Sequence, residues 1–264
     1  MKIRHLINPV AVPTESEFAA AQSITFASLR RAKAYAASRI DVEIVAIGYP
    51  EDMLITPEDF DKCTPLRRSI RDIDGFQRQK KLPLLVDLFR AASDLDDVAL
   101  CIFSNIDIGV MPHFYETVAR LADNGYDSFA INRTTVPKLW SSPEDLADIY
   151  AARGKPHEGI DCFGFRPAHA INYIFGESCI GVGPVGQLIA FNQFTFAERF
   201  CWLRSSHLTF HLGDDKAWLS LEMAPLHAHN FEELSSISSL LANSIDAQSN
   251  KDKLRLLKAA EAHA

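Results

Sequence analysis

An uninterrupted apolar run at residues 98–103 constrains the fold of this chain more than any other feature. Such a run is typical of a strand that is covered on both faces, as strands are inside an α/β sheet. The run stops at Ser104, Asn105 and Asp107, and a helical pattern follows at residues 114–121. A strand that ends in polar groups and leads into a helix is how an open α/β sheet forms its ligand crevice.

Asn105 and Asp107 are two residues apart, so in extended backbone their side chains leave on the same side. Two oxygen-bearing groups on one side can bind a hard cation whose remaining ligands are water and a phosphate. Asn and Asp are also common where a strand enters a turn, and spacing alone favours that structural role. Other parts of the chain support the cation site.

The N-terminal segment predicts a βαβ unit, with strands at residues 3–10 and 42–48 and a helix at residues 15–38. This unit predicts a parallel sheet with a right-handed crossover. It contains neither G-x-G-x-x-G nor a P-loop, which excludes the usual dinucleotide and Walker-type phosphate cradles. Asn8, at the tip of the first strand, is a candidate nucleoside contact, with a turn role as the alternative.

A basic segment with Arg78, Lys80 and Lys81 precedes a short apolar helix that runs to Phe89, with Pro83 in its first turn. Cations and free amides at a helix N-terminus form an anion site, so Arg78 and Lys81 are candidate diphosphate contacts. The alternative is a solvated basic face.

Polar groups also mark the next two predicted strands. The strand at residues 126–131 ends before Arg133, whose guanidinium suits a phosphate or a carboxylate. His157, Glu158 and Asp161 precede an aromatic strand, which is a natural place for a general base. The alternative is a surface loop with ordinary carboxylates.

Two histidines form a further cluster near the C-terminal third of the chain. His207, Thr209 and His211 alternate with apolar residues and therefore share one face of a predicted strand. Because Asp214 and Asp215 follow, either histidine is a candidate metal ligand. The alternative is one core histidine and one exposed histidine.

The 264 residues carry a formal net charge of −7, with a pI near 5.7. Such a chain has no electrostatic reason to bind nucleic acid. We expect a cytoplasmic protein, because no apolar run reaches bilayer-spanning length and no signal peptide is evident. The cysteines are odd in number and lack C-x-x-C, which indicates buried thiols in a reducing compartment: Cys63, Cys101, Cys162, Cys179 and Cys201.

Residues 1–229 read as one α/β domain, with no linker that demands a second. Residues 230–264 are Ser-rich, then Lys-rich, and predict a helical extension. We expect this extension to cover the body of the protein or to form a subunit contact in a homo-oligomer.

Five segments taken together resemble bacterial glycosyltransferases of the GT-A fold. They contain Lys81-Leu82-Pro83, Ser104-Asn105-Ile106-Asp107, Ile131-Asn132-Arg133, residues 157–163 and residues 207–218. The resemblance covers most of the chain. It implies a mostly parallel mixed sheet flanked by helices, and a reaction that takes a sugar from a nucleotide-sugar donor to an acceptor hydroxyl, on a carbohydrate or another molecule.

The resemblance also implies roles for individual residues. Asn105-Ile106-Asp107 occupies the place of the D-x-D motif, so Asp107 is the main ligand of Mn²⁺ or Mg²⁺ on the diphosphate. His211 is the candidate late ligand, with His207 as its same-face alternative. Asp161 is the candidate base on the acceptor side, and Glu158 is the second candidate.

Two alternative functions stay open at this point. A nucleotidyltransferase would use a related sheet, but it usually carries a Gly-rich N-terminal signature where this chain has Asn8-Pro9-Val10. A non-catalytic protein that binds a nucleotide or sugar is the other alternative, and Asn105 in place of an aspartate favours it.

Overall fold

The computed structural model describes residues 1–62, 65–90, 97–214 and 220–244. In these segments one mixed sheet is formed by β1 (Lys2–Ile7), β2 (Asp41–Ala46), β3 (Asp61–Lys62), β4 (Leu100–Ser104), β5 (Gly109–Val110), β6 (Ser128–Val136), β7 (Lys155–Phe165), β8 (Phe200–Leu203) and β9 (Thr209–Leu212). The strand order is β3-β2-β1-β4-β7-β6-β9-β5, and β8 pairs with β6. Most pairs are parallel, but β7 is antiparallel to both β4 and β6, and β5 to β9.

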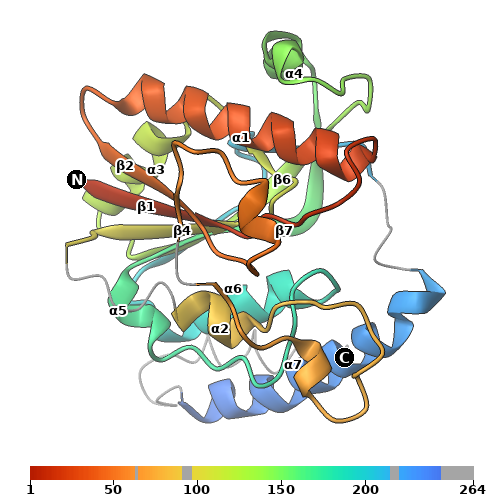
Figure 1. Ribbon diagram of the computed structural model, residues 1–264. Helices are drawn as coiled ribbons and strands as arrows, with labels where there is room; N and C mark the ends of the chain where they lie inside the picture. Colours follow the sequence, from red (N-terminus) through yellow and green to blue (C-terminus); the bar gives the residue numbers. More distant parts are fainter. Residues whose placement is uncertain (63–64, 91–96, 215–219, 245–264) are drawn as a thin grey trace.

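Helices cover both faces of the sheet (Figure 1). The α-helices are α1 (Glu17–Ala36), α2 (Leu85–Arg90), α3 (Phe114–Asp123), α4 (Leu146–Ala151), α5 (Pro167–Ala170), α6 (Val185–Phe196) and α7 (Ala224–Ser244). Short 3-10 turns lie at Asp52–Leu54, Ile70–Asp72, Pro143–Asp145 and Leu221–Met223. Helices α1 and α3 pack on one face, whereas α2, α6 and α7 pack on the other. The predicted GT-A-like α/β architecture is therefore confirmed.

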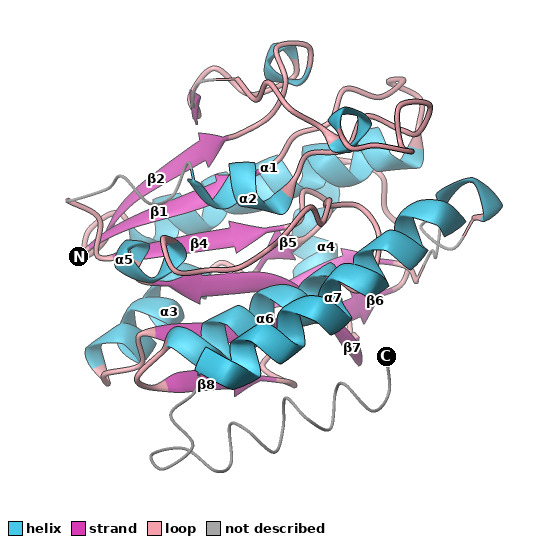
Figure 2. Cartoon of the chain, turned by 90° about the horizontal axis from the view of Figure 1, so that it is seen from below, coloured by secondary structure: helices cyan, strands magenta, loops and turns pink. Residues whose placement is uncertain are grey.

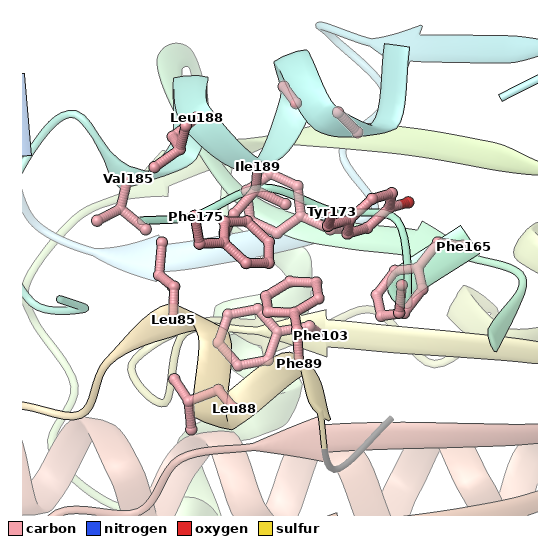
Figure 3. Close-up of a cluster of buried hydrophobic side chains, with 14 of the residues drawn as sticks. Leu85, Leu88, Phe89, Phe103, Phe165, Tyr173, Phe175, Val185, Leu188 and Ile189 are labelled. Carbon is pink, nitrogen blue, oxygen red and sulfur yellow. The ribbon is translucent and has the colours of Figure 1, made fainter. Parts of the chain in front are cut away.

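The buried strand predicted at residues 98–103 is observed as β4, and all of its residues are buried. Its side chains alternate between two cores: Leu100 and Ile102 face α1 and α3, while Cys101 and Phe103 face the opposite layer. In that layer, aromatic rings from β4, β7 and α2 meet the start of α6 (Figure 3). Burying each large apolar side chain contributes roughly 1.5–3 kcal/mol, so β4 anchors both layers.

The N-terminal βαβ unit is also confirmed. Strands β1 and β2 pair in parallel with Ile3 opposite Val42, and β1 pairs in parallel with β4 on its other side. Ser16 caps α1 by accepting a hydrogen bond from the Ala19 amide at 3.1 Å. Strands β1, β2 and β4 therefore all end at the same edge of the sheet.

Several boundaries differ from the sequence-based expectations. Strand β6 continues to Val136 instead of ending before Asn132, and β7 already begins at Lys155, ahead of the three titratable residues. Helix α2 begins at Leu85, so Pro83 precedes the helix rather than occupying its first turn. Strand β8 had no counterpart in the prediction, because four residues are too few to show a period.

The predicted alternation of His207 and His211 on one strand is wrong for His207. Strand β9 begins at Thr209, and His207 precedes it with a φ of 50°, outside extended backbone. Asp215 and Cys63, which the sequence also singled out, lie outside the described residues.

The helix expected from residue 230 begins at Ala224. It packs along α6 (Figure 2) and buries Leu226, Leu234, Ile237 and Leu241. Residues 245–264, the rest of the predicted extension, lie outside the described residues. In the described segments, no helix combines the length and the hydropathy needed to cross a bilayer.

A buried histidine joins β1 to its neighbours. In His5, Nδ1 lies 2.9 Å from the Tyr115 hydroxyl and Nε2 lies 2.9 Å from the Ser104 hydroxyl. Both ring nitrogens are thus satisfied without contact with water. Burial lowers the pKa of His5 to about 3, so the folded protein holds this ring neutral.

We expect His5→Gln to make stability less sensitive to acid. An unfolded-state pKa near 6.5 lies above the folded-state value of about 3, so the unfolded chain binds more protons in this window and the wild type loses stability as pH falls. His5 should contribute a slope of about 1.4 kcal/mol per pH unit. Urea unfolding from pH 7 to pH 4 should show the stability gap between wild type and variant shrinking on acidification. A gap independent of pH would show that the folded protein protonates this ring.

Candidate functional site

A cavity of about 1820 Å³ opens where β1, β2 and β4 end. Its lining includes eight of the candidate donor, metal and base residues that the sequence predicted: Asn8, Lys81, Asn105, Asp107, Arg133, Glu158, Asp161 and His211. Arg78 is exposed and does not line the cavity. Residues from five separate strands and their loops thus meet at one edge of the sheet.

Asp161 faces Asn105 because of the antiparallel register of β4 and β7. Ser104 pairs with Cys162, so the next position on each strand places Asn105 opposite Asp161. The Asn105 amide N–H donates to the Asp161 carbonyl at 3.0 Å. The side-chain Nδ2 of Asn105 donates to Oδ1 of Asp161 at 2.8 Å.

On its other side, Asp161 is the extra residue of a β-bulge. Ile131 of β6 pairs with Cys162 and Asn132 pairs with Ile160, so Asp161 has no partner on β6. Bulges of this kind turn a side chain out of the regular alternation and are frequent beside active sites. Here the carboxylate meets Arg133, whose Nη1 lies 3.2 Å from Oδ2 of Asp161.

The electrostatic environment of Asp161 has opposing parts. Burial raises the pKa of Asp161 above its usual range, and the carboxylate of Asp107 raises it further. The charges of Arg133, His211 and His157 lower it, but the net direction is upward. A carboxyl group whose pKa is raised while it keeps a cationic partner is suited to accept a proton near neutral pH.

Asp107 and His211 form a second pair beside Asp161. Nε2 of His211, on β9, lies 3.3 Å from Oδ2 of Asp107, although 104 residues (211 minus 107) separate them in sequence. Nδ1 of His211 lies 2.8 Å from the Gly213 carbonyl, which can only accept, so Nδ1 carries a proton. Burial alone would lower the pKa of His211, but its hydrogen bond to Asp107 and the Asp107 charge raise it overall.

This pair has the chemistry of a divalent-metal ligand set. A metal-ligating histidine usually donates its other ring N–H to a carbonyl or carboxylate, as Nδ1 of His211 does to Gly213. A carboxylate oxygen suits Mn²⁺ and Mg²⁺, whereas an imidazole nitrogen suits Zn, Cu, Fe and Ni. No group of three His, Cys, Asp or Glu residues within the described segments could hold a metal ion, so water and phosphate would supply the other ligands.

Arg133 links the base candidate to a second histidine. Its Nη2 lies 3.5 Å from Oδ1 of Asp214, which is also 3.1 Å from Nε2 of His157. Nδ1 of His157 accepts from the Gly159 amide at 2.8 Å, so the ring proton is on Nε2 and points to Asp214. The Nε of Arg133 is buried and has no hydrogen-bond partner among the residues that the structure describes.

Asn8 and Lys81 also line the cavity. Nδ2 of Asn8 donates to the Ile47 carbonyl at 2.6 Å and ties the ends of β1 and β2 together. Nζ of Lys81 lies 3.7 Å above the centroid of the Tyr49 ring and 2.6 Å from a carboxylate oxygen of Glu51. Lys80 and Lys81 of the basic segment both line the cavity, whereas Arg78 does not.

Two residues that sequence reasoning did not select complete the site. Trp202 of β8 lines the cavity, and its indole N–H donates to Oδ1 of Asn132 at 2.6 Å. Asn132 in turn donates to the carbonyls of His157 and Glu158, each at 2.9 Å. The side chain of Glu158 is exposed at the rim. A tryptophan in a short strand gives no pattern that would distinguish it from a core residue.

The chain matches no protein-family model, and no curated protein matches it. Solved structures do resemble it. TarS residues 1–349 from S. aureus in complex with UDP-GlcNAc has a TM-score of 0.57 and 10% identity, over 96% of this chain and 70% of that chain. The complex of the same TarS segment with UDP has a TM-score of 0.50 and 10% identity, over 95% and 74%. At such identity the similarity establishes the GT-A-like fold that the sequence predicted.

We expect Arg133→Met to destabilise the protein by about 3 kcal/mol at pH 7.5, because it leaves the buried Asp161 charge without its cation. The variant raises the folded-state pKa of Asp161 further above its unfolded value, so the deficit should diminish as pH falls and the carboxyl group is protonated. Urea unfolding at pH 7.5 and pH 5 measures both effects. The double variant Arg133→Met/Asp161→Asn should recover stability at pH 7.5; if it does not, Arg133 acts through packing.

Proposed function

We propose that this protein is a glycosyltransferase that moves a sugar from a nucleoside-diphosphate sugar to an acceptor hydroxyl, with a divalent metal on the diphosphate. One observation carries the proposal: a raised-pKa carboxyl group, Asp161, lies at the same sheet edge as the Asp107–His211 pair. The GT-A-like fold, shared with a protein solved in complex with UDP-GlcNAc, adds support.

The reaction determines what the two groups would do. Glycosyl transfer passes through an oxocarbenium-like state and releases a nucleoside diphosphate, so negative charge develops on the leaving group. Bound Mn²⁺ or Mg²⁺ supplies charge neutralisation there. Asp107 and His211 would hold it, and Lys81 would approach the diphosphate after exchanging its contact with Glu51 for the ligand.

Asp161 would accept the proton of the acceptor hydroxyl in an inverting reaction. Burial raises the pKa of Asp161 toward the operating range, while Arg133 keeps a positive charge beside it. Glu158, exposed at the rim, is the second candidate for this role. Asn8 follows the end of β1 and lines the cavity, and we propose it as a donor contact.

A non-catalytic protein that binds a nucleotide or sugar is the second candidate. One observation favours it: the side-chain N–H of Asn105 is directed to Asp161, and Asn105 offers no charge to a metal. Such a protein would bind the nucleotide with Mn²⁺ but would not turn over a nucleotide-sugar. Measuring both binding and hydrolysis of the donor therefore separates the two functions.

The proposal predicts that Asp107→Ala weakens Mn²⁺-dependent binding of a nucleoside diphosphate by about 100-fold or more, since even residues behind a ligand affect affinity 10–100-fold. Calorimetry with UDP, GDP, ADP and CDP, each with and without Mn²⁺, measures this effect. Asp123→Ala, at the exposed end of α3, is the matched control and should bind as the wild type does. Equal affinity of Asp107→Ala and the control would make Asp107 a turn residue and remove the metal site.

Lys81→Ala is expected to weaken donor binding by about tenfold or more, because a charge-assisted contact to phosphate is worth roughly 1.5–3 kcal/mol. Arg78→Ala removes a cation from the same segment but outside the cavity lining, so it should leave affinity unchanged. The same calorimetric titrations apply. Losses of similar size for both variants would indicate a general electrostatic effect rather than a contact from Lys81.

A further inference from the structure

Asn105 donates two hydrogen bonds to Asp161, one from its backbone and one from its side chain. Its backbone N–H donates to the Asp161 carbonyl at 3.0 Å, and its Nδ2 donates to Asp161 Oδ1 at 2.8 Å. A carboxylate oxygen only accepts, so the nitrogen of the Asn105 side chain must be the atom that faces it. Strands β4 and β7 fix this arrangement, because their register ends with Ser104 opposite Cys162.

Within the described part of the chain, each oxygen of the Asp161 carboxylate has one side-chain donor. Oδ1 accepts from Asn105 and Oδ2 accepts from Arg133. The other charged or titratable groups that act on Asp161 are Asp107 after β4, His157 on β7 and His211 on β9. The two donors lie on opposite oxygens and therefore fix the plane of the carboxylate, which stays partly open to the cavity.

We propose that Asn105 is a positioning residue for Asp161: its neutral side-chain amide donates to the buried carboxylate and holds it oriented toward the cavity. The inference rests on the proposed role of Asp161 as the base. It assigns Asn105 a function other than metal ligation, and it explains why a neutral amide occupies this position.

An aspartate at position 105 could not perform this task. It has the size of asparagine but presents oxygen in place of the N–H, so two carboxylates would face each other at hydrogen-bond distance. Like charges this close cannot both be ionised, and one of them would have to carry a proton. Asn105 supplies a donor without adding charge to a site that already holds Asp107 and Asp161.

Aspartate carboxyl ¹³C NMR on the full chain, without metal or nucleotide, tests the inference directly. Asp161→Asn assigns the Asp161 signal, which is then followed in a pH titration. In Asn105→Leu, which keeps the volume but removes the donor, the Asp161 midpoint should move upward by about one pH unit or more. In Asn105→Ser, whose hydroxyl can donate, the movement should be smaller, and this variant carries the test if Asn105→Leu fails to fold.

Asn132→Leu is the matched control. Asn132 is a neighbouring buried amide that donates to the backbone carbonyls of His157 and Glu158, so its loss disturbs β7 without removing a donor from the Asp161 carboxylate. The Asp161 midpoint should stay at the wild-type value in this variant. An unchanged midpoint in both Asn105 variants, or equal movement in the Asn132 control, would overturn the inference.

Mn²⁺ titration by calorimetry distinguishes positioning from ligation. Asn105→Leu should retain wild-type affinity for Mn²⁺ with UDP, whereas loss of tenfold or more with an unmoved Asp161 midpoint would make Asn105 a ligand. These experiments distinguish failure of the proposed glycosyltransferase function from failure of the positioning role of Asn105. A chain that binds no nucleotide would still show the NMR result, because that titration needs neither donor nor acceptor.

Discussion

The antiparallel pairing of β7 between β4 and β6 is the constraint on which the candidate site depends. Because β7 runs against its neighbours, its first half reaches the edge where β4 and β6 end, while Phe163 and Phe165 in its second half lie in the core. One strand thus delivers an acid to the crevice and anchors it in the aromatic cluster. Parallel strands alone would bring Asn8, Asn105 and Asp107 to this edge, but not Asp161.

Two carboxylates at this edge each lie beside a basic side chain. Asp161 is paired with Arg133, which also contacts Asp214, and Asp107 is paired with His211, whose pKa this contact raises. Taking an ion out of water costs several kcal/mol unless a partner offsets it, which explains why these pairs are so close. Lys81 adds a further cation to the lining of the same cavity, although the chain as a whole is acidic.

The parts of this fold that the sequence predicted are those fixed by local burial. The apolar run of β4 and the opening βαβ unit could be predicted because consecutive residues carry the signal. The contact between Asp107 and His211 was expected from the resemblance and from residue types. The place of Trp202 in the cavity lining could not be predicted, because a strand of four residues is too short to show a hydrophobic repeat. The exposure of Arg78 could not be predicted either, because its segment is irregular and has no hydrophobic repeat. The alternation of His207 with His211 predicted extended backbone at His207. This residue instead lies in the loop that precedes β9 and has a positive φ.

The β-bulge at Asp161 allows β7 to carry an acidic residue while its apolar side chains keep their positions in the core. In a regular strand, Ile160 would point away from the face that holds Phe163 and Phe165. In the observed pairing with β6, Asp161 is the extra residue of the bulge and has no partner. Ile160 therefore lies on the same face as Phe163 and Phe165 and packs in their cluster. Gly186 of α6 then lies so close to the Ile160 carbonyl that a side chain at position 186 would collide with it. Helix α6 thereby packs directly behind the bulge, so the apolar layer lies next to the strand position from which the carboxylate of the proposed base projects.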